Sequence, residues 1–597
     1  MQADGPAPLR TDRFLMGAAL NDRLQLDPPG IAIFQDAQCK SDARDMTEPL
    51  STSPPSNSAD QPAGIFRSTG IEQSLGTYLP ATAAVRVLNF ARVLLLTWTM
   101  TRTQFGLLAM VLLVVNVLTP LCSLGLNEAV ARYVPQQEQR GSLAAFMGKS
   151  FAVLLVVTAG SVALLLLFAP KLADFFFARL LANQSASQAP SSDALQLARL
   201  TGVVIALLVV YFYLLSVVKG LRMFSAMSRM ELSHSMLFLA GSGVVIVTGR
   251  LNAVALTAVY ALSLAVPIAY FAPRLIRRLR DWPAQSHPLA EPRLLSKLLK
   301  FSIWTMLAGV TWQVLLYYPA WFLNKVHGHE AVAVFAAVRQ VGQFALIAAA
   351  SVATVVITTV TNTWESRGRP HAERQLSLAF RGTCFALLIV CIVAALSKGL
   401  IILMFDPAYA PGASILPLQL LFFLLAAYLA FLPGHFHLQE KTRYMFWPLV
   451  AGVAGNVLLA YWLAGPRPVA FPSSGAWHVA AEALGRILSV GLTDAQGLSS
   501  AAWCGVLAMG IATGVCVLLV RAKCSRLDRG SYLVIAACVL LVARPWIMAI
   551  GGGVLILIAL GTEFIFTADE RRRIIGYMLE SLRNVPVLRR FTQRAHR

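Results

Sequence analysis

Charged residues are scarce in this chain: they make up 13% of its 597 residues, and only 29 residues are Asp or Glu. Soluble domains carry about a quarter charged residues, so this composition excludes an ordinary soluble fold. Apolar residues make up 57% and gather in long runs. Runs of about 20 residues let a helix cross a hydrocarbon core about 30 Å thick, and a helix satisfies its own backbone hydrogen bonds in lipid. The sequence therefore predicts an all-α integral membrane protein.

Several chemical motifs are also missing. The eight cysteines form no CxxC pair and fall mostly within apolar runs, so we expect no metal site, no disulfide framework and no cofactor. The chain has no GxxxxGK[ST] loop, and ATP-driven chemistry is not expected of it. A net charge of +21 would suggest nucleic acid in a soluble protein, but no motif that reads nucleic acid accompanies the charge. We expect the positive charge to face anionic lipid headgroups, with the lipid bilayer and not nucleic acid as the partner.

Fourteen apolar segments are predicted to cross the bilayer, and Lys and Arg concentrate in every second gap between them. Because positive charge is retained on the cytoplasmic side, this alternation predicts a multi-pass protein with both termini in the cytoplasm. The last two segments are predicted to turn at Arg544-Pro545, since one long helix would place the basic tail outside. The segments run roughly from 78 to 99, 104 to 126, 146 to 169, 200 to 218, 230 to 248, 253 to 273, 302 to 323, 331 to 357, 376 to 397, 413 to 434, 445 to 465, 500 to 520, 531 to 543 and 546 to 566.

A faint internal repeat at an offset near 227 residues organises these segments. It aligns "FAPKLADFF" with "LSKGLIILMFDPAYA". The repeat predicts two six-helix bundles in a pseudo-two-fold arrangement, with a cavity between them at the midplane and two extra C-terminal transmembrane helices, about 14 in total. The predicted parts are a disordered cytoplasmic extension (1–70), the first bundle (71–273), a basic cytoplasmic linker (274–301), the second bundle (302–522) with an extracytoplasmic insertion (466–499), helices 13 and 14 (531–566), and a basic cytoplasmic tail (567–597) that begins with Thr567 as a helix cap.

Three stretches of the chain resemble the polysaccharide flippase family of the multidrug, oligosaccharidyl-lipid and polysaccharide exporter superfamily. They are "LLLTWTMTRTQFGLLAMVLLVVNVLTPLCSLGLNEAVARYVP", "MFDPAYAPGASILPLQLLFF" and "LVAGVAGNVLLAYWL". The likeness spans about residues 70 to 585. It implies a transporter and not an enzyme, located in the bacterial inner (plasma) membrane. The cargo implied is a polyprenyl-diphosphate-linked oligosaccharide, a repeat unit of lipopolysaccharide or exopolysaccharide on undecaprenyl diphosphate. It is flipped from the inner to the outer leaflet by alternating access, with polysaccharide polymerase machinery as a possible partner.

Arg86, Arg92 and Arg339 fall inside predicted membrane segments. A charge near the bilayer centre costs about 2.5 to 3.5 kcal/mol on insertion scales, so such residues usually face a water-filled cavity. Arg86, Asn89 and Arg92 are spaced by three, while Arg339 and Gln343 are four apart, so each set shares one helix face. We expect these five residues to line one cationic substrate-binding cavity, because guanidinium groups pair bidentately with phosphate oxygens. The alternative is that Arg86 and Arg92 reach an interface and that Arg339 bonds carbonyls of a neighbouring helix.

Two further positions are of interest. Glu128 and Arg132 lie four apart in "NEAVARYVP" and are predicted to form a surface ion pair that could act as a gate. His234 could titrate near neutral pH, but the interpretation we favour is a helix-packing residue. The seventh helix carries Tyr317, Tyr318 and Pro319, where many relatives have an acidic residue, so no ion-coupling role is carried over to it.

Other functions leave recognisable signals. A cation-coupled multidrug exporter of the same superfamily would need a carboxylate in the membrane part of the first bundle, and the acidic residue nearest to one is Glu231 at the inner end of the fifth segment. A lipid II flippase would also need a cationic cavity, with a denser set of arginines across its first two helices. An enzyme acting on lipid-linked sugars would need an acidic or His cluster, and those in the largest outer gap are scattered.

Overall fold

The computed structural model describes residues 71–139, 142–177, 192–221, 223–280, 294–439, 441–464, 497–524 and 527–572. These residues form helices joined by short connections, and they contain no β-strand. Twelve helices in this part of the chain are long and apolar enough to cross a membrane. The all-α membrane fold expected from the composition is thus confirmed. The predicted N-terminal extension, the insertion at 466–499 and most of the basic tail lie outside the described residues.

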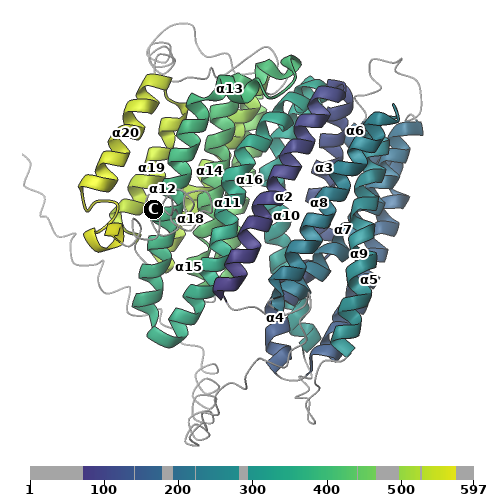
Figure 1. Cartoon of the computed structure of the whole chain (residues 1–597), viewed down its shortest axis with the longest axis horizontal. Helices are drawn as coiled ribbons and strands as arrows, with labels where there is room; N and C mark the ends of the chain where they lie inside the picture. The colour runs from purple at the N-terminus through teal and green to yellow at the C-terminus, as the bar shows by residue number, and fades with distance from the viewer. Residues whose placement is uncertain are drawn as a thin grey trace, which may run out of the picture. The chain divides into compact units, whose positions relative to one another are not determined.

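The first half of the described chain is built around α7, which α3, α5 and α9 all contact (purple to teal in Figure 1). In addition, α2 packs on α8, and α8 packs on α9. The elements, in order, are α2 (Ile71–Thr99), α3 (Arg102–Cys122), α4 (Leu126–Gln139), α5 (Leu143–Leu167), α6 (Ala169–Phe177), α7 (Ser192–Gly220), α8 (Phe224–Val247) and α9 (Ala253–Arg280).

The second half repeats this packing with its own helices. Here α14 takes the place of α7 and contacts α11, α12 and α18, while α10 packs on α16 and α16 packs on α18. The repeat of contacts supports the pseudo-two-fold arrangement predicted from sequence. The elements are α10 (Leu294–His327), α11 (His329–Arg367), α12 (Arg369–Leu396), α13 (Lys398–Ile402), η3 (Pro407–Ser414), α14 (Leu416–Phe431), α15 (Gly434–Leu438), η4 (Thr442–Met445), α16 (Phe446–Ala464) and α18 (Leu498–Lys523).

A C-terminal hairpin packs on α12 (yellow in Figure 1). It consists of α19 (Arg529–Ala537), η5 (Cys538–Val542) and α20 (Pro545–Gly561). The chain leaves η5 at Ala543 and Pro545 opens α20, as proline can at a position that needs no backbone N–H. The turn predicted at Arg544-Pro545 is therefore present. Both apolar arms are shorter than the twelve long spans, so the total number of crossings remains approximate.

Arg381, a buried arginine of α12, binds residues at the start of the tail. The Arg381 guanidinium lies 3.2 Å from a Glu570 carboxylate oxygen and 3.6 Å from an Asp528 oxygen, and Nη1 donates to the Ile565 carbonyl at 2.5 Å. The Glu570 backbone N–H donates to Thr567 Oγ1, and the Thr567 N–H donates to the Glu570 carboxylate. This is a capping box, so Thr567 caps a helix as predicted.

Helix boundaries extend beyond the predicted apolar segments. The helix α9 continues to Arg280 and α10 begins at Leu294, so much of the predicted linker 274–301 is helical. Likewise, α11 runs from His329 to Arg367 and is longer than the apolar segment 331–357. Helical hydrogen bonding does not stop where the hydrocarbon ends, and polar residues continue these helices into the aqueous zone.

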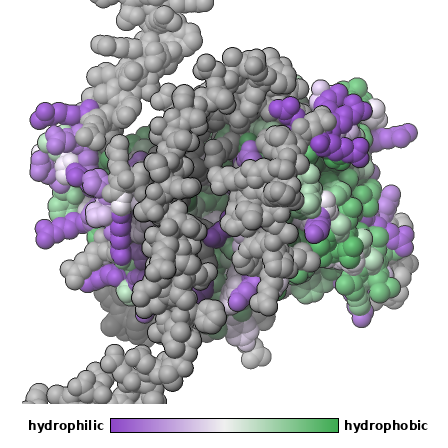
Figure 2. Space-filling model, turned by 90° about the horizontal axis from the view of Figure 1, so that it is seen from below, coloured by the Kyte–Doolittle hydropathy of each residue, from purple (hydrophilic) through white to green (hydrophobic). Residues whose placement is uncertain are grey.

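Basic residues gather where α9 and α18 end. The ends of α9 and α18 carry Arg277, Arg278, Arg280, Arg521 and Lys523, and we call this the basic end and the opposite one the distal end. Figure 2 shows the molecule from below, with hydrophilic side chains at the edges and hydrophobic residues on the flank at the right. The assignment of the basic end to the cytoplasm remains a prediction.

At the basic end, α4 of the first half contacts α10 of the second. The Arg132 guanidinium lies 5.0 Å from the centre of the Phe301 ring, and Thr305 Oγ1, whose nearest acceptor is the Ser302 carbonyl at 2.9 Å, lies 3.4 Å from the Gly125 carbonyl. Gly125 has a φ of 68° and lies so close to the α10 backbone that a Cβ atom would clash with it. Glycine is therefore needed here both for its conformation and for its size.

At the distal end, two similar hydrogen-bonded contacts join the halves. Near the end of α10, Lys325 Nζ donates to the Phe175 carbonyl of α6, and Asn324 Nδ2 donates to the Phe176 carbonyl at 3.3 Å. Near the end of α2, Trp98 Nε1 donates to the Met404 carbonyl, which follows α13, at 2.8 Å. We call these two contacts the distal latches.

The distal latches follow the internal repeat. Trp98 and Lys325 are 227 residues apart, and their acceptors Met404 and Phe175 are 229 apart. In each half, the end of the first long helix therefore binds a carbonyl at the end of the short helix in the other half. The symmetry indicates that both distal latches form in the same conformation of the two halves.

Candidate functional site

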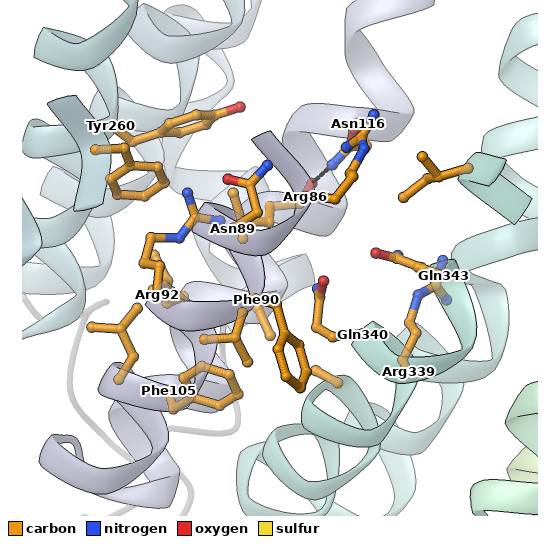
Figure 3. A pocket seen from close by; sticks show the side chains of 18 of the residues that line it. Arg86, Asn89, Phe90, Arg92, Phe105, Asn116, Tyr260, Arg339, Gln340 and Gln343 are labelled. Carbon is orange, nitrogen blue, oxygen red and sulfur yellow. Dashed lines mark hydrogen bonds between the residues drawn. The ribbon is translucent and has the colours of Figure 1, made fainter. Parts of the chain in front are cut away.

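A cavity of about 250 Å³ is lined by α2, α3, α8, α9, α10 and α11, so both halves contribute to it (Figure 3). The position of the cavity between the basic end and the distal end can be followed along α10. Phe301 and Thr305 make the contacts at the basic end, Tyr317 lines the cavity, and Asn324 and Lys325 make a distal latch. The cavity thus lies between the two levels at which the halves touch.

All five residues predicted for a cationic cavity line this space. Arg86, Asn89 and Arg92 come from α2, and Arg339 and Gln343 come from α11 across the cavity (Figure 3). The lining residues include no Asp or Glu among the described part of the chain. A chamber with three guanidinium groups and no lining carboxylate attracts anions and disfavours cations.

Glu231 is an acidic residue that interacts with one of the lining arginines. It lies on α8 and interacts electrostatically with Arg86 and Lys219, but it does not line the cavity. Its charge offsets part of the positive charge on the α2 side. The remaining excess charge is still positive, since Arg92 and Arg339 are added to Arg86.

Arg92 stacks on an aromatic ring. Its guanidinium carbon lies 4.0 Å from the centre of the Phe238 ring of α8. His234 and Tyr260 line the cavity on the same side. Stacking holds a guanidinium plane in place and leaves its N–H groups directed along that plane, where they can meet a ligand oxygen.

Arg339 is more deeply enclosed, with 4% of its surface exposed. Nη1 donates to the Leu316 carbonyl of α10 at 2.5 Å, and the guanidinium lies 4.2 Å from the Tyr317 ring centre and 5.2 Å from that of Phe423. Nε and Nη2 are buried and have no hydrogen-bonding partner in the described part of the protein. The two interpretations of Arg339 from sequence therefore hold together: it bonds a neighbouring helix's carbonyl and it lines the cavity.

Several lining residues were not predicted as part of the site. Asn116 and Gln340 add carboxamides, and Tyr260, Tyr317 and Phe90 add aromatic rings. Asn116 is an isolated polar residue within an apolar run, and Gln340 lies three residues before Gln343. The sequence therefore gives a weak indication that both belong to the site. The aromatic residues left none, because aromatic side chains are common wherever helices pack.

His234 lines the cavity and also packs between helices. Its Nδ1 lies 3.2 Å from the Ser263 carbonyl and 3.1 Å from Ser263 Oγ of α9. Its ring lies 5.5 Å from that of Tyr211 and 5.6 Å from that of Tyr260. These contacts agree with the packing role favoured from sequence.

The predicted ion pair between Glu128 and Arg132 is not formed. The ion pairs among the described residues do not include it, and Arg132 lies over Phe301 instead. Both residues lie on the partly exposed face of α4, where an ion pair contributes little and an aromatic ring from α10 competes for the guanidinium. Arg132 nevertheless lies where the halves meet, and a gating role for the two residues remains a prediction.

Arg381 was overlooked in the sequence although it falls inside the segment 376–397. The structure places it on α12 among Asp528, Glu570 and the Ile565 carbonyl, away from the cavity lining. Its role is to anchor the C-terminal hairpin. Among the described residues, no three His, Cys, Asp or Glu side chains gather as a metal site.

Comparison with known proteins agrees with this architecture. Residues 73–364 match a family model described as "Polysaccharide biosynthesis protein". A structure of the lipid II flippase MurJ in an inward closed conformation superposes with a TM-score of 0.57 and 13% identity, covering 83% of this chain and 99% of that one. No curated protein matches the sequence significantly.

Other solved transporters have the same fold. A MOP superfamily transporter from Pyrococcus furiosus superposes with a TM-score of 0.54 and 13% identity, covering 77% of this chain and 97% of that one. That protein is described as having a binding pocket of reverse polarity. A MATE structure in the straight conformation gives a TM-score of 0.54 and 15% identity, covering 77% of this chain and 98% of that one.

The fold is that of membrane transporters of the multidrug, oligosaccharidyl-lipid and polysaccharide exporter superfamily. The match of residues 73–364 to the polysaccharide biosynthesis model, which runs from α2 into α11, supports a polysaccharide flippase-type family within this fold. The family resemblance inferred from sequence is thereby confirmed. These likenesses support a transporter, and they do not identify its cargo.

Proposed function

We propose that this protein flips an undecaprenyl-diphosphate-linked oligosaccharide from the inner to the outer leaflet of a bacterial plasma membrane by alternating access. The observation that carries the proposal is the cavity between the halves, with Arg86, Arg92 and Arg339 in its lining and no lining carboxylate among the described residues. A lipid diphosphate is a compact anion that must cross the bilayer centre, and guanidinium groups bind phosphate oxygens with both charge and geometry.

The rest of the lining suits the sugar part of such a cargo. Asn89, Asn116, Gln340 and Gln343 supply carboxamides that can both donate hydrogen bonds to sugar hydroxyls and accept them. Aromatic rings such as Phe90 offer flat apolar surfaces. These carboxamides are uncharged, so they can bind different neutral sugars.

Alternating access fits the contacts between the halves. Hydrogen bonds and ring contacts join them at the basic end and at the distal end, with the cavity between. Opening one set while the other stays closed would expose the cavity to one side at a time. The alternatives, a lipid II flippase and a cation-coupled multidrug exporter, differ in cargo and in their dependence on an ion gradient.

The test replaces two cations on one helix face. The double change Arg86→Gln with Arg92→Gln keeps an unbranched stem with a hydrogen-bonding group at its end but removes two charges. We expect it to abolish translocation of a fluorescent lipid-linked oligosaccharide in proteoliposomes, measured as protection of the label from an impermeant reductant. Removing one charge-assisted hydrogen bond typically costs about 1.5 to 3 kcal/mol, roughly 10- to 150-fold in affinity.

The control variant is Arg250→Gln, which removes an exposed arginine of the same half outside the cavity. It should translocate like the wild type. Lysine at 86 and 92 should restore activity only in part, because an ammonium lacks the bidentate fork. Wild-type rates in a normally folded double Gln variant would contradict the proposal. Competition with lipid II, and transport with and without Na⁺ or H⁺ gradients, separate the two alternatives.

A further inference from the structure

Pro319 interrupts the hydrogen bonding of α10 beside the cavity. Proline has no backbone N–H, so the Leu315 carbonyl, four residues earlier, loses its usual donor within the helix. Asn456 of α16 takes that place: its Nδ2 donates to the Leu315 carbonyl at 3.4 Å. The Asn456 side chain is fully buried, with 0% of its surface exposed. A buried polar side chain in this position satisfies a backbone carbonyl that has lost its donor within the helix.

The next carbonyl along the helix is held from another direction. The Leu316 carbonyl accepts from Nη1 of Arg339, which reaches over from α11. Two neighbouring carbonyls at the proline break are thus bound by side chains from two different helices. Next to them is a small crevice, whose lining includes Arg339, Leu316, Pro319, Gln419, Phe422 and Gly505.

The position of Nη1 determines which part of Arg339 remains for a ligand. A guanidinium group binds a phosphate with two parallel hydrogen bonds from neighbouring N–H groups. With Nη1 committed to Leu316, the remaining edge is formed by Nε and Nη2, and these two atoms have no hydrogen-bonding partner in the described part of the protein. Tyr317 and Phe423 face the guanidinium and restrict its rotation.

We propose that Asn456 and the proline break at Pro319 position Arg339 so that its Nε–Nη2 edge receives a phosphate of the lipid diphosphate. This inference rests on the proposed function and deepens it, since it assigns one bidentate contact to Arg339 and a positioning role to Asn456. Asn456 secures the Leu315 carbonyl, which keeps the break in one geometry. That geometry presents the Leu316 carbonyl to Nη1, and Nη1 sets the direction of the opposite edge.

The edge is buried in the present arrangement, so a phosphate reaches it only when α10 and α11 shift together, with the bond from Nη1 to the Leu316 carbonyl intact, away from the side chains that cover the edge. A ligand that satisfies the edge in the shifted arrangement favours that arrangement. Because α10 also carries the basic-end contact at Thr305 and the distal latch at Asn324, a shift at the break is transmitted to both ends. Lysine cannot replace Arg339, since one ammonium cannot hold the carbonyl and form a fork as well.

The first experiment measures binding of undecaprenyl diphosphate without sugar to the purified full-length protein in nanodiscs. We expect Asn456→Ala to weaken binding by about five- to tenfold. In a background that carries Arg339→Gln, the same change should have an effect of less than about twofold, because the residue through which Asn456 acts is already gone. The control is Thr513→Val, which removes another buried bond to a backbone carbonyl in the same half, from Thr513 Oγ1 to Leu425 at 3.4 Å. It should leave binding unchanged.

The second experiment follows thermal unfolding without ligand. Asn456→Ala should lower the melting temperature of the wild type. It should lower that of the Pro319→Ala protein much less, because alanine restores the N–H that the Leu315 carbonyl lacks. If the Ala variant does not fold, Asn456→Leu keeps the side-chain volume without the donor and serves in both experiments.

Each outcome is decisive. Equal decreases in affinity from Asn456→Ala with and without Arg339 would overturn the inference, and so would equal decreases in stability with and without Pro319. Wild-type binding that Asn456→Ala leaves unchanged would overturn the inference alone. A wild-type protein that does not bind undecaprenyl diphosphate at all would overturn the proposed function, and the inference with it.

Discussion

The distal latches should control how often the cavity opens at that end. Trp98→Phe removes the donor of one latch and keeps an aromatic ring, while Asn324→Leu removes one of the two donors of the other latch and keeps the volume. Each change deletes one hydrogen bond to a carbonyl across the interface between the halves. A bond of this kind contributes about 0.5 to 1.5 kcal/mol.

Both bonds belong to the arrangement in which the distal end is closed, so removing them should shift the equilibrium toward opening there. The two latches are separate contacts that share no residue, so their effects should add. The sum is about 1 to 3 kcal/mol, which changes the ratio of closed to open molecules about 5- to 150-fold.

The shift can be measured with spin labels at the distal end. Val247 at the end of α8 and Leu403 after α13 are 88% and 74% exposed and belong to opposite halves, so labels there should not disturb packing. Electron–electron double resonance should show a longer distance population that grows in the order wild type, single variants, double variant. Trp546→Phe is the control, because Trp546 is 62% exposed on α20, away from the latches. A distance distribution that the double variant leaves unchanged would refute the latch interpretation.

Three further predictions concern packing and topology. Gly106→Ala should destabilise the protein by about 1 to 3 kcal/mol in detergent unfolding, because the added Cβ would overlap the α11 backbone. The control is Gly243→Ala, whose Cβ meets nothing within 4 Å and which should not destabilise the protein. Equal stability of the two variants would contradict the packing of α3 on α11. Glu570→Gln should expose the tail to proteolysis and lower thermal stability, since it leaves a buried guanidinium with a weaker partner, and an unaltered cleavage pattern would argue against the anchor. Impermeant maleimide applied to intact cells should label Gly475→Cys but not Gln285→Cys, and the reverse pattern would invert the predicted topology.

The sequence predicted the spans well because length and apolar content are strong physical constraints on a helix in lipid. It also brought together Arg86, Asn89 and Arg92, since residues spaced by three share a helix face wherever that helix lies. Arg339 and Gln343 could be assigned to the same cavity because the cost of burying charge in lipid leaves few other places for them. The turn at Arg544-Pro545 followed from the charge rule, because one long helix would have placed the basic tail outside.

Contacts between distant helices could not be predicted in this way. The partner of Arg132 was expected four residues away on its own helix, but Phe301 of α10 occupies that place. The capture of the Leu316 carbonyl by Arg339 depends on how α10 and α11 are placed side by side. Tyr260 and Tyr317 enter the cavity lining only once α9 and α10 are packed. Local periodicity carries no information on such pairs.

The cavity between the halves is proposed to carry a lipid diphosphate across the bilayer, and the charge of the lipid can be varied to test this. Purified wild-type protein in proteoliposomes is supplied with a labelled undecaprenyl-diphosphate-linked oligosaccharide and, separately, with the same oligosaccharide on an uncharged polyprenyl lipid. We expect protein-dependent movement of the diphosphate-linked cargo to the opposite leaflet and little movement of the uncharged one. Equal rates for both lipids, or rates no higher than in protein-free liposomes, would show that the cationic cavity does not select this cargo.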